Sequence, residues 1–102
     1  MKRRVTGIGG VFFKAKGDVA SLNAWYEHHL GIDYKSSGGY PYWQWRAMEA
    51  PERTGGTVFS IFKSDSNYFG SPEQQFMFNM RVEDLSTLIE TLRNEGVTIA
   101  GE

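Results

Sequence analysis

Two adjacent histidines, His28 and His29, are the only imidazoles among the 102 residues, and the chain has no cysteine. Neighbouring residues on a helix point about 100° apart, so the two rings cannot chelate one ion together. We expect His29 to be a hydrogen-bonded core residue on the apolar face of a helix, and His28 to face solvent. A thiol nucleophile, a thiolate metal site and a Gly-x-Ser-x-Gly elbow are all missing from the sequence. These residue types favour binding over nucleophilic catalysis.

The aromatic stretch at residues 40–46 carries the most informative polar side chains. In an extended strand, Trp43 and Trp45 share one face, and Tyr42, Gln44 and Arg46 share the other. The first face can pack, whereas the amide and guanidinium of the second can hold a polar or anionic group of a ligand. The alternative is ordinary cross-strand aromatic pairing with an exposed arginine.

The alternation of side chains along the other predicted strands places four more residues on the inward side of the sheet: Phe12, Ser60, Phe78 and Met80. Such a lining is mostly apolar with few polar groups, which suits a small-molecule pocket and equally suits a plain hydrophobic core. The predicted ligand-binding residues are Phe12, Tyr42, Gln44, Arg46, Ser60, Phe78 and Met80.

The charge balance excludes several partners. Eleven basic and twelve acidic residues give a net charge of −1, which supplies no field to hold a nucleic acid or an anionic membrane. No apolar run reaches the length of a membrane span, and the basic residues at 2–4 are not followed by a signal-peptide core. We expect a cytoplasmic protein.

Hydrophobic periodicity predicts an α+β domain. Asp18 and Asp84 are N-caps of two amphipathic helices, which end at Gly31 and Gly96. Residues 36–39 and 49–56 are predicted as turns, and residues 63–75 as irregular. Strands are predicted at residues 5–15, 40–47, 57–62, 76–82 and 97–100, with one more short strand after Ile32.

The strand–Asp–helix–Gly order occurs twice, which indicates an internal repeat of one βα unit. The same order is also common in unrelated α+β proteins. The first copy has room after its helix for three strands, whereas only six residues follow Gly96 in the second. If the repeat is real, the chain is naturally short, is a fragment, or borrows strands from a partner.

Residues 7–16 with 25–32, which include Tyr26 and Leu30-Gly31, resemble the opening of a vicinal-oxygen-chelate domain, the glyoxalase/bleomycin-resistance/dioxygenase class. Residues 76–85 with 92–97 resemble the second module of that family. The resemblance implies paired βαβββ modules whose curved sheets enclose a cavity. It divides a single domain, residues 1–102, into module one at about 1–70 and a partial module two at about 71–102. The implied element order is strand, helix, four strands, helix, strand.

Metal-dependent members of the family hold one divalent ion with His and Glu from the first and last strands of both modules. The matching positions here are about Gly10, Ser60 and Phe78, and the fourth lies beyond Glu102. Glycine and phenylalanine have no ligating side chain, and serine is a weak ligand. We therefore expect no metal and no other cofactor.

Three functions remain open. The first is a metal-free small-molecule-binding or sequestration protein of the glyoxalase/bleomycin-resistance type. The second is a metal-dependent lyase or dioxygenase whose site a partner chain completes. The third is an interaction module with a filled core. Unpaired strand edges in an incomplete second module also lead us to expect a homodimer, with strand exchange as one solution.

Overall fold

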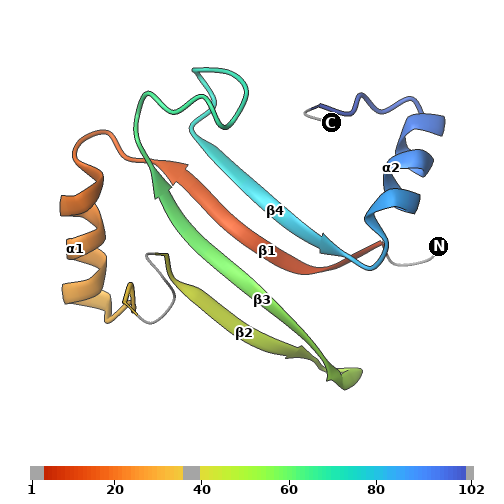
Figure 1. Cartoon of the computed structure of the whole chain (residues 1–102), viewed down its shortest axis with the longest axis horizontal. Coiled ribbons are helices and arrows are strands. Elements are labelled where there is room, and N and C mark those ends of the chain that lie inside the picture. The colour runs from red at the N-terminus through yellow and green to blue at the C-terminus, as the bar shows by residue number, and fades with distance from the viewer. Residues whose placement is uncertain (1–3, 36–39, 101–102) are drawn as a thin grey trace.

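The computed structural model describes residues 4–35 and 40–100, and this part of the chain forms a four-stranded sheet with two helices. The α+β class is thus confirmed. Figure 1 shows the two helices at opposite ends of the sheet. In chain order, the elements are β1 (Val5–Lys14), α1 (Val19–Leu30), β2 (Tyr42–Ala47), β3 (Ala50–Phe62), β4 (Phe76–Val82) and α2 (Leu85–Asn94).

The sheet is mixed, with the strand order β2-β3-β1-β4. β1 runs parallel to β3 and antiparallel to β4, and β2 runs antiparallel to β3. The parallel neighbours β1 and β3 are joined through α1 and β2, because parallel strands require a long crossover connection. The sheet contains two βα units, β1–α1 and β4–α2. Their strands, β1 and β4, are antiparallel neighbours (Figure 1).

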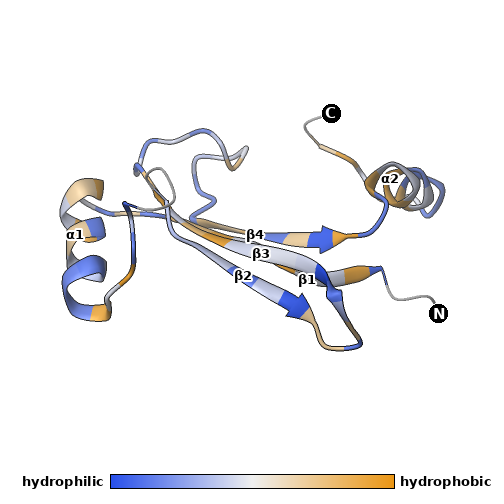
Figure 2. Ribbon diagram, turned by 60° about the horizontal axis from the view of Figure 1, so that its bottom comes forward, coloured by the Kyte–Doolittle hydropathy of each residue, from blue (hydrophilic) through white to orange (hydrophobic). Residues whose placement is uncertain are grey.

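One face of the sheet, here called the α1 face, is covered at one end by α1. The Tyr26 ring of α1 lies 6.4 Å from the ring of Phe13 and 5.2 Å from that of Phe59. Figure 2 shows hydrophobic segments of β1 and β3 at the end of the sheet nearest α1. Residues paired directly across strands share a face, so Val11 and its partners Phe59 and Phe78 also belong to the α1 face.

The opposite face, here called the loop face, is partly covered by residues 63–75. Tyr68 stacks on Phe62 at 5.3 Å, and the buried ring of Phe69 lies 5.1 Å from Phe62. The Lys14 ammonium donates a 3.2 Å hydrogen bond to the carbonyl of Pro72 and lies 5.6 Å from the centre of the Phe69 ring. These contacts tie the long β3–β4 connection to the sheet.

The predicted helix caps are confirmed. The Asp18 carboxylate accepts hydrogen bonds from the amide of Ser21 at 2.9 Å and from its hydroxyl at 2.7 Å. The Ser21 side-chain bond, followed by the backbone bond, lowers the pKa of Asp18. Gly31 ends α1 at φ 68°, in the left-handed region where a Cβ is disfavoured. Asp84 caps α2 in the same way, accepting from the Thr87 amide at 3.1 Å.

The prediction of a loop at residues 49–56 is wrong, because β3 begins at Ala50. Two aromatic side chains of β2 lie over the glycines that suggested a loop. The indole of Trp45 covers Gly55, and the ring of Tyr42 covers Gly56, so that a side chain at either glycine would collide with the ring. Cross-strand aromatic packing thus stabilises a glycine-containing strand that is weak by itself.

Two further predicted strands are not formed. Residues 32–35 are not a strand, and the predicted turn at 36–39 lies outside the described residues. Residues 97–100 are not a strand either; the Val97 amide instead donates to the Leu92 carbonyl at 2.9 Å and closes the end of α2. A strand needs a neighbouring edge to pair with, and none of the described strands lies beside residues 97–100.

The prediction of a core histidine is also wrong. His29 is exposed, and its ring lies 4.9 Å from that of Trp25, which is itself half exposed. The Tyr26 ring of α1 packs on the sheet, whereas Trp25 and Leu30 of the same helix are exposed by 50% and 60%. Among the described residues, the buried apolar side chains are Ala15, Pro41, Ile61 and Phe69.

Candidate functional site

Trp45 occupies the centre of the best-defined site on the sheet. Its benzo ring fits against two glycines from different strands, because an added Cβ would lie 2.6 Å from the ring at Gly7 and 2.5 Å from it at Gly55. The indole N–H donates a 2.9 Å hydrogen bond to the Thr57 hydroxyl, which donates in turn to the Ile8 carbonyl at 2.6 Å. The indole is thus held by packing and by a hydrogen-bond chain that links β2, β3 and β1.

Arg81 of β4 places its guanidinium over this indole, with its carbon 5.8 Å from the ring centre. This is within the range of a cation–π contact. Within the described part of the chain, the Arg81 guanidinium makes no ion pair, whereas nearby Arg53 is neutralised by Glu83 at 2.8 Å. Arg81 therefore keeps its full complement of N–H donors for a further acceptor.

A cavity of about 370 Å³ lies beside Trp45 and Arg81. Its volume is within the range of small-molecule sites. Its walls combine the Trp45 indole with two guanidinium groups, two carboxylates and two hydroxyls. The lining comes from β1, β2, β3, β4 and the turns at their ends: Thr6, Trp45, Ala47, Glu49, Arg53, Thr54, Arg81, Val82 and Glu83. A planar ligand could contact the indole while an anionic group accepts hydrogen bonds from Arg81.

The polar face of β2 carries three of the predicted site residues, which the structure does not bring together at one cavity. Arg46 donates a 2.9 Å hydrogen bond to the carbonyl of Pro51, so its guanidinium closes the β2–β3 hairpin. Gln44 is exposed on the edge strand, and Tyr42 lies flat over Gly56. These three side chains share one face, as expected, but they do not converge. Arg46 lines a cavity of about 400 Å³ near the hairpin, and Tyr42 lines a separate one of about 180 Å³ near the end of α1.

Phe12 and Ser60, two other predicted site residues, are directly opposite each other on the loop face. The Phe12 ring lies 5.3 Å from that of Phe62 and 6.3 Å from that of Tyr68, so it belongs to a packed aromatic cluster. Neither Phe12 nor Ser60 lines the cavity beside Trp45 and Arg81, nor any of the cavities lined by Arg46, Tyr42 or Arg4.

Phe78 and Met80 were expected beside Phe12, and the register corrects this. Phe12 pairs with Met77, whereas Phe78 pairs with Val11, so Phe78 lies on the α1 face. Met80 is two residues further along the same strand and lies on the same side as Phe78. Both side chains are about half exposed, at 56% and 52%.

The positions that the resemblance assigns to metal ligands do not converge. Gly10 and Ser60 lie on the loop face, and Phe78 lies on the opposite one. Across residues 4–35 and 40–100, no three His, Cys, Asp or Glu side chains are grouped so that they could hold a metal ion.

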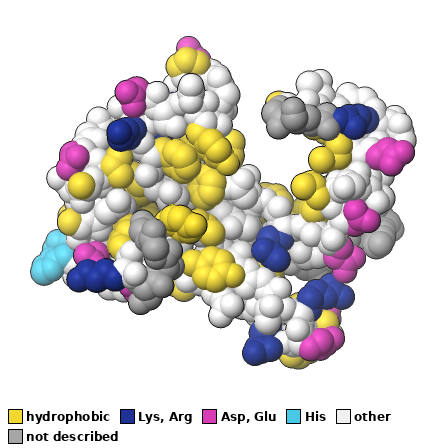
Figure 3. All heavy atoms as spheres, viewed as in Figure 1, with side chains coloured by type: hydrophobic (Ala, Val, Ile, Leu, Met, Phe, Trp, Pro, Cys, Tyr) yellow, Lys and Arg dark blue, Asp and Glu magenta, His cyan; other side chains and the backbone are white. Residues whose placement is uncertain are grey.

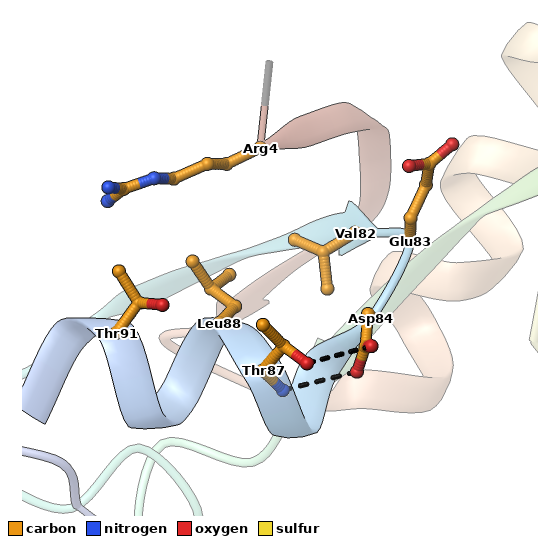
Figure 4. A pocket seen from close by; sticks show the side chains of 7 residues that line it. All are labelled: Arg4, Val82, Glu83, Asp84, Thr87, Leu88 and Thr91. Atoms are coloured by element: carbon orange, nitrogen blue, oxygen red, sulfur yellow. Dashed lines mark hydrogen bonds between the residues drawn. The ribbon is translucent and has the colours of Figure 1, made fainter. Parts of the chain in front are cut away.

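A second groove, of about 230 Å³, lies between α2 and the start of β1. Figure 4 shows Arg4 extended above Leu88 and Thr91, and Asp84 hydrogen-bonded to Thr87. Arg4 also makes a bidentate pair with Glu95, at 3.2 and 2.8 Å, which raises the pKa of Arg4 and lowers that of Glu95. Because these polar groups already have partners, the groove attaches α2 to the sheet and offers few free groups to a ligand.

Sequence reasoning missed Trp45 and Arg81 as site residues. Their proximity depends on the strand order, which places β4 and β2 on opposite sides of the β1–β3 pair. One signal was available, since Gly7 and Gly55 are small residues in strands rich in aromatic ones and leave room for a large side chain.

Comparisons of the chain with known protein families, with curated proteins and with solved structures found no match in any of the three. Neither helix of the described chain combines the length and apolar character that crossing a bilayer requires.

Proposed function

We propose that this chain is a metal-free small-molecule-binding or sequestration protein of the vicinal-oxygen-chelate type. Its ligand has a planar ring and an anionic group, and it occupies the cavity beside Trp45 and Arg81. The observation that carries this proposal is the Arg81 guanidinium, which has no ion-pair partner among the described residues and lies over an indole at the wall of a 370 Å³ cavity.

The arrangement of the strands supports the family assignment. The resemblance requires the first and last strands of a module to contribute to one site. β1 and β3, the first and last strands of the first unit, are adjacent and parallel. The second unit starts from β4, the antiparallel neighbour of β1.

The chemistry of the cavity supports the ligand class. A guanidinium binds carboxylate or phosphate through two parallel hydrogen bonds, which fixes the orientation of the anion. The indole offers an apolar surface to an aromatic ring. The hydroxyls of Thr6 and Thr54 are further polar groups in the lining, although Thr6 already donates to the Arg81 carbonyl at 3.1 Å.

The test uses benzoate and phenyl phosphate as probes, with benzyl alcohol as the uncharged control. Benzoate has nine non-hydrogen atoms, so roughly −0.5 kcal/mol per atom gives a Kd of about 1 mM. Removing the charged donor with Arg81→Gln should weaken binding by about tenfold or more. Arg46→Gln is the matched control, because Arg46 donates to Pro51 at the hairpin.

Titration calorimetry decides the outcome, and recovery of unchanged probe distinguishes binding from catalysis. We expect the two anionic probes to bind to the wild type and to Arg46→Gln, and only weakly to Arg81→Gln. If Arg46→Gln loses binding and Arg81→Gln does not, the site lies on the polar face of β2. If benzyl alcohol binds as tightly as benzoate, the ligand does not require an anionic group and this part of the proposal is wrong.

The interaction-module alternative is favoured by a different observation, the large apolar surface that this chain leaves exposed. Half-exposed aromatic and aliphatic side chains occur along β4 and α1, and few are buried. That surface leads to the inference below, which is independent of the ligand site.

A further inference from the structure

The outer edge of β4 has no neighbouring strand within the described chain. Its α1-face row is apolar throughout: Phe76, Phe78, Met80 and Val82. The first three are exposed by 51%, 56% and 52%. Monomeric proteins usually protect such an edge with lysine, proline or a covering element, and β4 carries neither of these residues. Its only charged residue is Arg81.

The chain exposes far more surface than its size requires. Its accessible surface is 7773 Å², whereas a compact monomer of 11.6 kDa exposes about 5,800 Å². Its radius of gyration is 16.2 Å, against about 13 Å for a compact domain of this length. The excess of roughly 1,900 Å² per chain is the area that an obligate dimer buries on each subunit.

The space beside β4 is open. Figure 3 shows a wide notch between the body of the sheet and α2, with hydrophobic side chains of α2 facing into it. α2 is amphipathic, and its apolar residues Leu85, Leu88, Ile89 and Leu92 are exposed or only half buried. The notch therefore offers an unpaired strand edge and an apolar helix face at the same place.

We propose that a second copy of this chain fills the notch by pairing its β4 antiparallel with β4 of the first copy, about a two-fold axis at Asn79. This register uses the full length of the strand. It places Phe78 opposite Met80 of the partner subunit and Phe76 opposite Val82 of the partner subunit, so the apolar row continues across the interface. It also separates the two Arg81 side chains, which would repel each other in a register centred on Arg81.

Asn79 gives a second reason for this register. Its amide nitrogen is buried and has no hydrogen-bond partner. A two-fold axis at this residue places an identical carboxamide directly opposite, and each amide can donate to the oxygen of the other after a side-chain rotation. Pairing would thus satisfy a donor that is costly to leave unpaired.

The partner's β4 also explains the position of α2. In the antiparallel arrangement, the first residues of the partner's strand lie beside the carboxyl end of β4, where α2 begins. Leu88 of α2 lines a groove with Val82, so part of the apolar face of α2 lies toward the carboxyl end of β4. The other free edge, β2, is a weaker candidate, because its aromatic rings are already used to cover Gly55 and Gly56.

The register can be tested by disulfide formation, because the natural chain has no cysteine. Residues directly opposite in an antiparallel pair have Cα atoms about 4.5 or 5.5 Å apart, within the range that a disulfide can bridge. We expect Asn79→Cys to form a cross-linked dimer on mild oxidation. Phe78→Cys should remain monomeric on denaturing gels, because its symmetry mate lies diagonally on the same face, about 7–8 Å away and beyond the reach of a disulfide. Gln44→Cys on β2 should also remain monomeric.

The oligomeric state of the full chain provides the second measurement. Sedimentation should show a dimer for the wild type and for Met48→Lys, a substitution at the exposed hairpin. Phe78→Lys should raise the dissociation constant at least tenfold while circular dichroism is unchanged. A monomeric wild type at 100 µM would overturn the proposal, as would cross-linking of Gln44→Cys in place of Asn79→Cys, which would assign the interface to β2.

Discussion

The substitution Gly55→Ala tests how Trp45 is held. A Cβ on Gly55 would lie 2.5 Å from the indole, so the ring must move outward by about an ångström to reach ordinary contact. Overpacking of this kind costs about 1–3 kcal/mol. The same movement breaks the hydrogen bond to Thr57, worth about 1 kcal/mol. The expected loss in the free energy of unfolding is therefore about 2–4 kcal/mol.

Urea denaturation followed by tryptophan fluorescence measures this loss. Gly17→Ala is the matched control, because an added Cβ there meets no atom within 4 Å and Gly17 does not have a positive φ. We expect the control to be neutral or slightly stabilising, since alanine restricts the unfolded chain more than glycine does.

A double substitution isolates the contact itself. In a Trp45→Leu background the ring is gone, so Gly55→Ala should cost less than about 1 kcal/mol, and the difference is the coupling energy. If Gly55→Ala costs the same in both backgrounds, or no more than Gly17→Ala, the glycine is not making room for the indole and the site geometry is wrong.

Two further predictions concern the ties between elements. Thr57→Val removes the acceptor of the Trp45 indole and should cost about 1–3 kcal/mol in urea denaturation, whereas Thr57→Ser keeps the hydroxyl and should cost less. The hydrogen bonds from Arg4 lower the pKa of Glu95, so the attachment of α2 is complete above the ordinary glutamate range and is lost as the pH falls through the lowered value. Amide exchange in α2 should accelerate over that acidic range, and Arg4→Gln should remove the dependence; a variant that keeps it would refute the role of this pair.

The local signals in the sequence predicted the helices well. Asp18 and Asp84 are caps whose carboxylates accept amides from the first turn, and Gly31 adopts the left-handed conformation that glycine favours. Each of these interactions is made within a few residues, so the neighbouring sequence determines it.

The errors concern interactions between distant segments. Gly55 and Gly56 favour a loop by themselves, and only the rings of Trp45 and Tyr42 make them part of a strand. The faces of β4 depend on the register with β1, which shifts between Ile8 and Gly10. A displacement of one residue moves every side chain to the other face, and strand phase could not detect it.

The most direct test of the proposed site is the ¹⁵N–¹H resonance of the Trp45 indole during titration with benzoate. The chain has three tryptophans, so the Trp45 signal can be assigned by substituting that residue alone. We predict a saturable shift of this resonance in the wild type. In Arg81→Gln, the apparent affinity for benzoate should be at least tenfold lower. An unchanged indole resonance at 20 mM benzoate, or the same titration curve in Arg81→Gln, would contradict the assignment of this cavity as the binding site.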